Sequence, residues 1–179
     1  GAHYRQLVDG ATFNIAGTEL RVLHTPGHTH HHVSYVLRDD TGTVHGVFTG
    51  GSMLYGTTGR TDLIGPDETE GLSHAQYHSD HKLADRLPPD TPIYPTHGFG
   101  SFCAATPTSG ESSTVGEQAR VNPALTQDEQ SFVDELIAAG LVLFVITLAV
   151  NLFARDAVGG AALPVVRDMV DRLTEVPMA

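Results

Sequence analysis

The chain has 179 residues, and its 21 acidic side chains against 10 basic ones give a formal net charge of −11 at pH 7. This length suits one ordinary domain. With 40% hydrophobic and 17% charged residues, the chain can form a buried core. The acidic balance argues against a nucleic-acid binder, which needs clustered positive charge. The single cysteine excludes an intramolecular disulfide.

The first half of the chain is predicted to consist of short strands. Residues 11–15 pair with 19–23 in one predicted hairpin, and residues 33–37 pair with 43–48 in a second, because Val, Leu, Phe and Tyr recur in these runs. The Gly- and Thr-rich residues 50–66 are predicted to form a loop.

A helix is predicted to begin at Pro66, where the first turn is acidic, and to run to about Leu87, where Pro88-Pro89 ends it. Residues 92–94 then form a short buried strand. The polar residues 98–123 are predicted to be a long loop, which in a domain of this size is often functional.

The last third of the chain is predicted to be helical. A capping box over 126–129 predicts a helix from Gln127, Gly159-Gly160 is expected to break it, and 165–173 is expected to form a short helix. The run 136–154 has 19 residues and no charge. Because a membrane span needs about 20 apolar residues, this run fits a transmembrane helix, and a helix buried in a core or an oligomer interface is the alternative.

The chain begins at Gly1 and its first residues do not resemble a signal peptide. We therefore expect a cytoplasmic protein, with association to a membrane through 136–154 as the alternative. The oligomeric state is not indicated by the sequence.

Four of the 11 histidines lie within five positions, at His28 and His30 to His32, between two predicted strands. Imidazole is the commonest metal ligand and is costly to bury without partners, so the cluster favours a metal site over a solvated loop. The turn Pro26-Gly27 aims His28 away from the strand end. His97 follows another predicted strand and is the second candidate ligand.

Three other features are weaker candidates. Gly50-Gly51 allows close approach of the backbone to a ligand or another strand, and Arg60 can bind an anion or pair with Asp62. His74, His78 and His81 share one helix face, which we interpret as solvated because no Glu follows the first His as in zinc proteases. Cys103 is not expected to act as a nucleophile, since no activating base is indicated.

Taken in order, Thr25-Pro-Gly-His28, Phe48-Thr-Gly-Gly51-Ser, Gly59-Arg-Thr-Asp62 and Pro95-Thr-His97-Gly resemble the metallo-β-lactamase superfamily. They are most similar to the branch of persulfide dioxygenases, glyoxalase II-type thioesterases and rhodanese-linked relatives. The resemblance implies an α/β fold, the C-terminal part of an αββα sandwich followed by an unusual apolar helix. We expect three segments: a partial metallo-β-lactamase-like domain over 1–135, an apolar helix and candidate transmembrane span over 136–154, and a short helix or tail over 155–179.

The resemblance also implies roles for single residues. His28 matches the metal ligand of the Thr-Pro-Gly-His turn, and His97 matches the last ligand, which serves the second metal in two-metal members. Arg60 matches an arginine near the substrate-binding loop. Gly51 occupies the position of the family's bridging Asp and has no side chain to offer. His30, His31 and His32 are less favoured substitutes.

The activity implied is that of a zinc-dependent hydrolase of thioesters or esters, or of an iron-dependent persulfide dioxygenase. Its substrate would be a small thioester or a glutathione persulfide. The family's His-x-His-x-Asp-His motif is absent, so we expect an incomplete enzyme that binds Zn²⁺ or Fe²⁺ weakly by itself. One alternative is a catalytically inactive scaffold or binding domain, membrane-tethered if 136–154 spans a bilayer. Another is a passive metal-binding protein that uses the histidine cluster.

Overall fold

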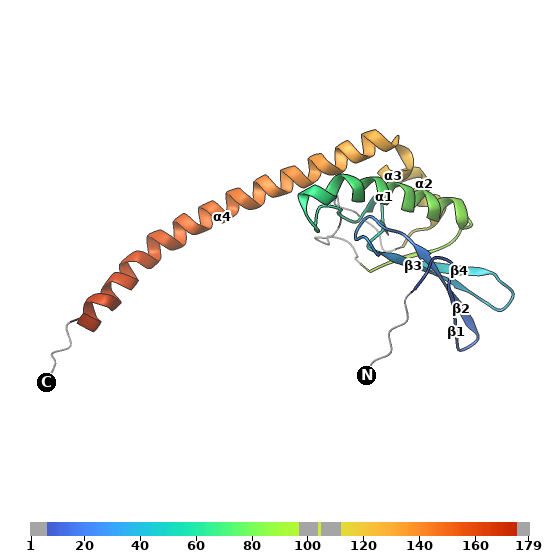
Figure 1. Ribbon diagram of the computed structural model, residues 1–179, viewed down its shortest axis with the longest axis horizontal. Helices are drawn as coiled ribbons and strands as arrows, with labels where there is room; N and C mark the ends of the chain where they lie inside the picture. Colours follow the sequence, from blue (N-terminus) through green and yellow to red (C-terminus); the bar gives the residue numbers. More distant parts are fainter. Residues whose placement is uncertain (1–6, 97–103, 105–111, 175–179) are drawn as a thin grey trace. The chain divides into compact units, whose positions relative to one another are not determined.

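The computed structural model describes residues 7–96, 104 and 112–174, with side chains described up to residue 155 (Figure 1). His97 and Cys103 lie outside the described residues. The chain divides into two compact units, Gly1–Gly140 and Leu141–Ala179. The candidate site belongs to the first unit.

Five strands of the first unit form a sheet in the spatial order β1-β2-β3-β4-β7. Neighbours from β1 to β4 are antiparallel, and β7 pairs with β4 in parallel. Both predicted hairpins and the predicted strand near residue 93 are thereby confirmed. The bounds are β1 Thr12–Ile15, β2 Thr18–His24, β3 Val33–Arg38, β4 Val44–Gly50 and β7 Ile93–Pro95.

The turn between β1 and β2 explains the register of the first hairpin. Ala16 and Gly17 have φ angles of 51° and 85°. Two central residues with positive φ match the right-handed twist of paired strands, and glycine tolerates this conformation without steric cost.

The loop expected over 50–66 contains a small second sheet, so that prediction was wrong in part. Strands β5 (Met53–Leu54) and β6 (Thr57–Thr58) are antiparallel, and all four of their residues are buried. Two-residue strands are too short to produce an alternating pattern in the sequence.

Helix α1 (Pro66–Arg86) confirms the predicted helix at both ends. Pro66 begins it, Asp67 and Glu68 lie in its first turn, and Arg86 lies in its last turn. This charge order is favourable for the helix dipole.

Helices α1, α2 (Val115–Val121) and α3 (Pro123–Thr126) cover one face of the five-stranded sheet (Figure 1). Val47 and Ile93 of the sheet pack in one core cluster with Leu83 of α1 and Val115 of α2. All four are at most 2% exposed, and each buried side chain of this kind contributes about 1.5–3 kcal/mol. On the other face Phe48 and Tyr94 stack at 5.4 Å and are more than 40% exposed.

The predicted loop over 98–123 was also wrong in part, because α2 (Val115–Val121) lies within it and α3 (Pro123–Thr126) follows. A capping box begins α2: the Glu117 N–H donates to Oγ1 of Thr114, and the Thr114 N–H donates to Oε2 of Glu117. The motif Thr-x-x-Glu is present in the sequence, so this start could have been predicted.

Helix α4 (Glu129–Thr174) starts two residues later than predicted, with the Ser131 N–H donating to Oδ1 of Asp128. It continues through Gly159-Gly160, where a break was expected, and includes the short helix expected over 165–173. A glycine costs a helix interior only about 1 kcal/mol relative to Ala, which is not enough to end a long helix.

Candidate metal-binding corner

The turn that carries His28 joins β2 to β3 and is fixed against α1. Ser79 of α1 donates its hydroxyl to the Pro26 carbonyl at 2.6 Å. Gly27 has φ +143°, and a Cβ placed on it would lie 2.5 Å from Cα of Gln76. Only glycine lets the turn approach the helix this closely, so the Pro-Gly pair determines where His28 lies.

The imidazole of His28 is oriented by a backbone carbonyl. Its Nδ1 lies 2.8 Å from the Arg60 carbonyl oxygen, and a carbonyl only accepts, so Nδ1 carries the proton. In this tautomer the lone pair is on Nε2. Metal-binding histidines typically have the same arrangement, in which one ring nitrogen donates to a carbonyl or carboxylate and the other binds the metal.

Two glycines enclose the His28 ring. A Cβ on Gly51 would lie 2.8 Å from Nε2 of His28, and a Cβ on Gly59 would lie 2.8 Å from Nδ1. The close approach predicted at Gly50-Gly51 is therefore an approach to a histidine side chain. The ring fills the space in which a side chain at position 51 would begin.

His32 joins this turn to the end of β4. Its Nδ1 lies 2.9 Å from Oγ1 of Thr25, and its Nε2 accepts the Gly51 N–H at 3.0 Å. Burial lowers the pKa of His32 to about 4, with further lowering by His28 and a smaller opposing effect of Thr25. His32 is therefore neutral at pH 7, and its acceptor nitrogen is engaged by the backbone.

The other two histidines of the cluster are directed elsewhere. Nε2 of His30 lies 3.6 Å from a carboxylate oxygen of Glu68 on α1, and both side chains are about half exposed. The rings of His30 and His31 lie 6.4 Å apart. Among the described residues, no group of three or more His, Cys, Asp or Glu side chains is arranged to hold a metal ion.

Arg60 forms the ion pair with Asp62 that the sequence allowed. Its Nε donates to Oδ1 at 2.8 Å and its Nη2 donates to Oδ2 at 2.6 Å, in a bidentate arrangement. The hydrogen bonds from Arg60 lower the pKa of Asp62. Because the side chain of Arg60 is only 11% exposed, its first role is to hold the loop whose carbonyl orients His28. A contact between Arg60 and substrate stays a prediction.

A buried polar network beneath the corner was missed by the sequence analysis. Gln76 donates to Ser52 at 3.0 Å and to Asp80 at 3.1 Å, and Ser52 donates to Asp80 at 3.2 Å. Burial raises the pKa of Asp80 to about 7, against smaller lowering effects of Gln76 and Ser52. The only signal in the sequence was the i, i+4 spacing of Gln76 and Asp80 on a predicted helix.

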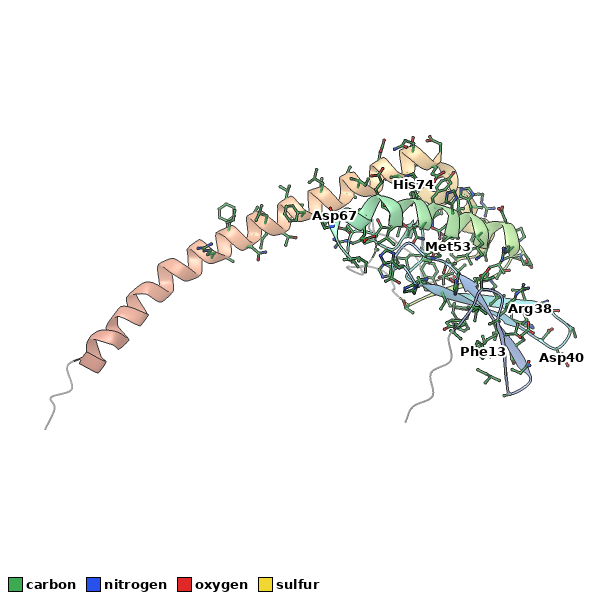
Figure 2. The ribbon with its side chains drawn as sticks, in the orientation of Figure 1. Phe13, Arg38, Asp40, Met53, Asp67 and His74 are labelled. Atoms are coloured by element: carbon green, nitrogen blue, oxygen red, sulfur yellow. The ribbon has the colours of Figure 1, made fainter. Side chains whose placement is uncertain are left out.

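The histidine face of α1 is not simply solvated, contrary to our interpretation. His74 and His78 both contact Oε1 of Glu129 at the start of α4, at 2.7 and 3.0 Å. Figure 2 shows His74 on α1, beside the first turns of α4. His81 lies against the ring of Tyr77, with 4.4 Å between ring centres. The face therefore packs against the first turn of α4.

Comparison with known proteins gives the wider context of this corner. No protein-family model matches the chain. It is 34% identical to the mitochondrial persulfide dioxygenase ETHE1 of Homo sapiens over 125 residues, which are 70% of this chain and 42% of that protein. It is 27% identical to the hydroxyacylglutathione hydrolase of Pseudoalteromonas translucida over 148 residues, covering 69% of this chain and 52% of that one.

Solved structures of similar proteins also match this chain. A metallo-β-lactamase from Staphylococcus aureus matches with a TM-score of 0.65 and 31% identity, over 75% of this chain and 39% of that one. ETHE1 from Myxococcus xanthus matches with a TM-score of 0.56 and 27% identity, over 73% and 50%. The chain thus spans about half of these relatives or less.

The fold, together with the order of the four motifs along the sequence, defines a metallo-β-lactamase-fold protein, as the sequence predicted. The α/β fold class is confirmed. Within that superfamily, the chain belongs to the branch that contains persulfide dioxygenases and hydroxyacylglutathione hydrolases.

The described residues do not by themselves make up a metal site. They bring one suitable nitrogen, Nε2 of His28, to this corner. Gly51 has no side chain, and the acceptor nitrogen of His32 bonds to the Gly51 N–H. His97 lies outside the described residues.

Proposed function

We propose that this chain is part of a metal-dependent enzyme that acts at the sulfur of a small thioester or persulfide of the glutathione type. The observation that carries the proposal is the hydrogen bond from Nδ1 of His28 to the Arg60 carbonyl, which orients the ring as metal-binding histidines are oriented. The similarity to persulfide dioxygenase ETHE1 and to hydroxyacylglutathione hydrolase supports the substrate class.

For the metal, we propose zinc in a hydrolase, with iron in a dioxygenase as the alternative. A Bacillus velezensis relative, 33% identical over 94 residues, is named a probable polyketide biosynthesis zinc-dependent hydrolase. Imidazole suits both metals. His28 and His97 would each contribute one nitrogen, and the other ligands would come from outside the described residues.

Metal retention and turnover test this proposal together. The purified protein, extended upstream by a segment that carries the family's His-x-His-x-Asp-His motif, is loaded with Zn²⁺ or, without oxygen, with Fe²⁺, and dialysed. Bound metal, hydrolysis of a hydroxyacyl thioester of glutathione, and oxygen uptake with glutathione persulfide are then measured. We expect metal-dependent turnover that falls at least about tenfold in His28→Ala. The control is His45→Ala, because His45 pairs with Asp39 at 2.8 Å away from this corner.

Turnover that is equal in the wild type and in His28→Ala would overturn the assignment of His28. Absence of any metal-dependent turnover in the wild type would overturn the proposed activity for this chain.

The second candidate function is an inactive scaffold or binding domain, which Gly51 favours. The family's bridging carboxylate is missing there, and the His28 ring lies in the space where it would begin. The variant Gly51→Asp tests this candidate, because it restores a carboxylate, and the His28 ring must shift to admit it. Metal retention and turnover that appear only in Gly51→Asp would support the scaffold.

A further inference from the structure

A second feature of the chain is the apolar part of α4. The segment 136–154 has 19 residues without a charge. Within Glu129–Arg155, the most apolar window of 18 residues has a mean hydropathy of 2.6, and none of it is buried. A core helix of a soluble protein would be buried, so this segment is not one. Its strongly exposed side chains are Leu141, Val142, Phe144, Val145, Ile146, Leu148, Val150, Leu152 and Phe153.

These side chains cover about two thirds of the helix circumference, and Leu143, Thr147 and Asn151 lie in the remaining sector. Successive residues of an α-helix are rotated by about 100°, so Leu141, Leu148 and Leu152 lie on one side. By the same geometry Val142, Ile146 and Phe153 lie about 120° away around the axis, and Val150 lies opposite Leu141. A helix that packs on one partner needs only one apolar stripe, whereas a helix that is apolar over most of its circumference needs an apolar surrounding.

The length and the polar groups of the segment fit a bilayer. Nineteen residues extend about 28 Å, close to the hydrocarbon thickness of about 30 Å. The hydroxyl of Thr147 donates to the Leu143 carbonyl at 2.8 Å, so it needs no water. Asn151 lies one turn before Arg155, where a polar group can reach the headgroups.

We propose that residues 136–154 cross a lipid bilayer and anchor this protein to a membrane. Leu136, Ala139 and Gly140, at the start of this segment, are half-buried within the first unit. We place these three residues at headgroup level. Residues 141–154 then extend about 21 Å, and local thinning of the bilayer accommodates the difference from the hydrocarbon thickness of about 30 Å. The proposal does not depend on the enzymatic activity proposed above.

The chain has no Trp, so a single introduced Trp reports its own depth. We choose Phe144→Trp near the middle of the segment, with Val121→Trp of α2, where Val121 is 58% exposed, as the control. Both variants are reconstituted into phosphatidylcholine vesicles whose acyl chains carry bromine near the headgroup or near the bilayer centre. We expect bromine near the bilayer centre (deep bromine) to quench the indole fluorescence of Phe144→Trp at least about twofold more than bromine near the headgroup (shallow bromine). Neither position should quench the indole fluorescence of Val121→Trp.

Stronger quenching of the Phe144→Trp variant by shallow bromine would mean a helix lying on the surface and would overturn the span. Quenching no greater than that of the Val121→Trp variant would overturn membrane insertion altogether.

Fractionation of cells that express the full chain is the second test. We expect the wild type to stay with the membranes in alkaline carbonate, and Val145→Arg/Leu148→Arg to move to the soluble fraction, since a central Arg opposes insertion. The matched control is Ile15→Arg/Val121→Arg, at two exposed apolar residues of the first unit, and it should stay with the membranes. A wild type that is monodisperse in detergent-free buffer, as a monomer or as an oligomer of defined size, would overturn the proposal.

Discussion

At the scale of single residues, the candidate corner depends on positions where a side chain is missing. Gly27 allows the turn to contact α1, while Gly51 and Gly59 make room for the His28 ring. A Cβ at any of these three glycines would prevent the close approach seen there. The position of His28 therefore depends on three residues that have no side chain. Such close approach of backbone is a recurrent use of glycine.

The first prediction concerns Gly27. We expect Gly27→Ala to lower the free energy of unfolding by about 2–4 kcal/mol, because the new Cβ meets the α1 backbone and φ is unfavourable. Gly17 is the matched control, since it also has a positive φ but nothing lies within 4 Å of a Cβ placed on it. Gly17→Ala should cost about 1–2 kcal/mol in the same urea titration. Equal losses in the two variants would refute the close contact with α1.

The second prediction concerns Asp80. The folded state raises its pKa from 3.8 to about 7, so the folded chain holds this proton more tightly than the unfolded chain. This contribution to stability is fully present below about pH 4 and is lost as the pH rises through about 7. Urea unfolding of the wild type and of Asp80→Asn at several pH values measures it.

Because Asn has no proton to lose, we expect Asp80→Asn to gain stability relative to the wild type between pH 4 and pH 7, by at most about 4 kcal/mol. Asp85→Asn, an exposed position on the same helix, should keep the pH dependence of the wild type. A constant difference between Asp80→Asn and the wild type across this range would contradict the raised pKa.

At the scale of secondary-structure elements, the sequence correctly predicted the strands and helices whose sequence signals are local. The hairpins were indicated by runs rich in Val, Leu, Phe and Tyr, and α1 by Pro66 with its acidic first turn. The predictions failed where polar residues form regular structure, as in α2, and where strands are very short, as in β5 and β6. The network around Asp80 could not be predicted either, because it depends on which polar side chains are buried between α1 and the turn that joins β4 to β5.

The capping box of α2 provides the third prediction. Thr114→Ala removes the acceptor for the Glu117 N–H, so we expect a loss of about 0.5–2 kcal/mol in the free energy of unfolding. Thr126→Ala is the control, because its hydroxyl donates to the Asn122 carbonyl within the short helix α3 and caps no N-terminus. A thermal or urea titration that ranks Thr126→Ala as the more damaging change would count against the role of the cap.

At the scale of the whole molecule, α4 takes part in two different environments. Its first turns are inside the first unit, where Phe132 and Val133 are at most 1% exposed and pack with Ala124 and Tyr77. Farther along, the same helix exposes large apolar side chains such as Phe153, at 76%. The first turns of α4 thus stabilise the first unit, whereas its later apolar segment needs an apolar solvent.

This difference gives the fourth prediction, on two phenylalanines of α4. Phe132→Ala should lower the free energy of unfolding of the first unit by about 3–5 kcal/mol, since it leaves a cavity in a closed cluster. Phe153→Ala should change it by less than about 0.5 kcal/mol, because that ring has no core around it. Both are measured by urea unfolding in a mild non-ionic detergent that covers the apolar segment. If both variants lose stability equally, the apolar segment contributes to the core of the first unit and its exposed side chains do not need a bilayer.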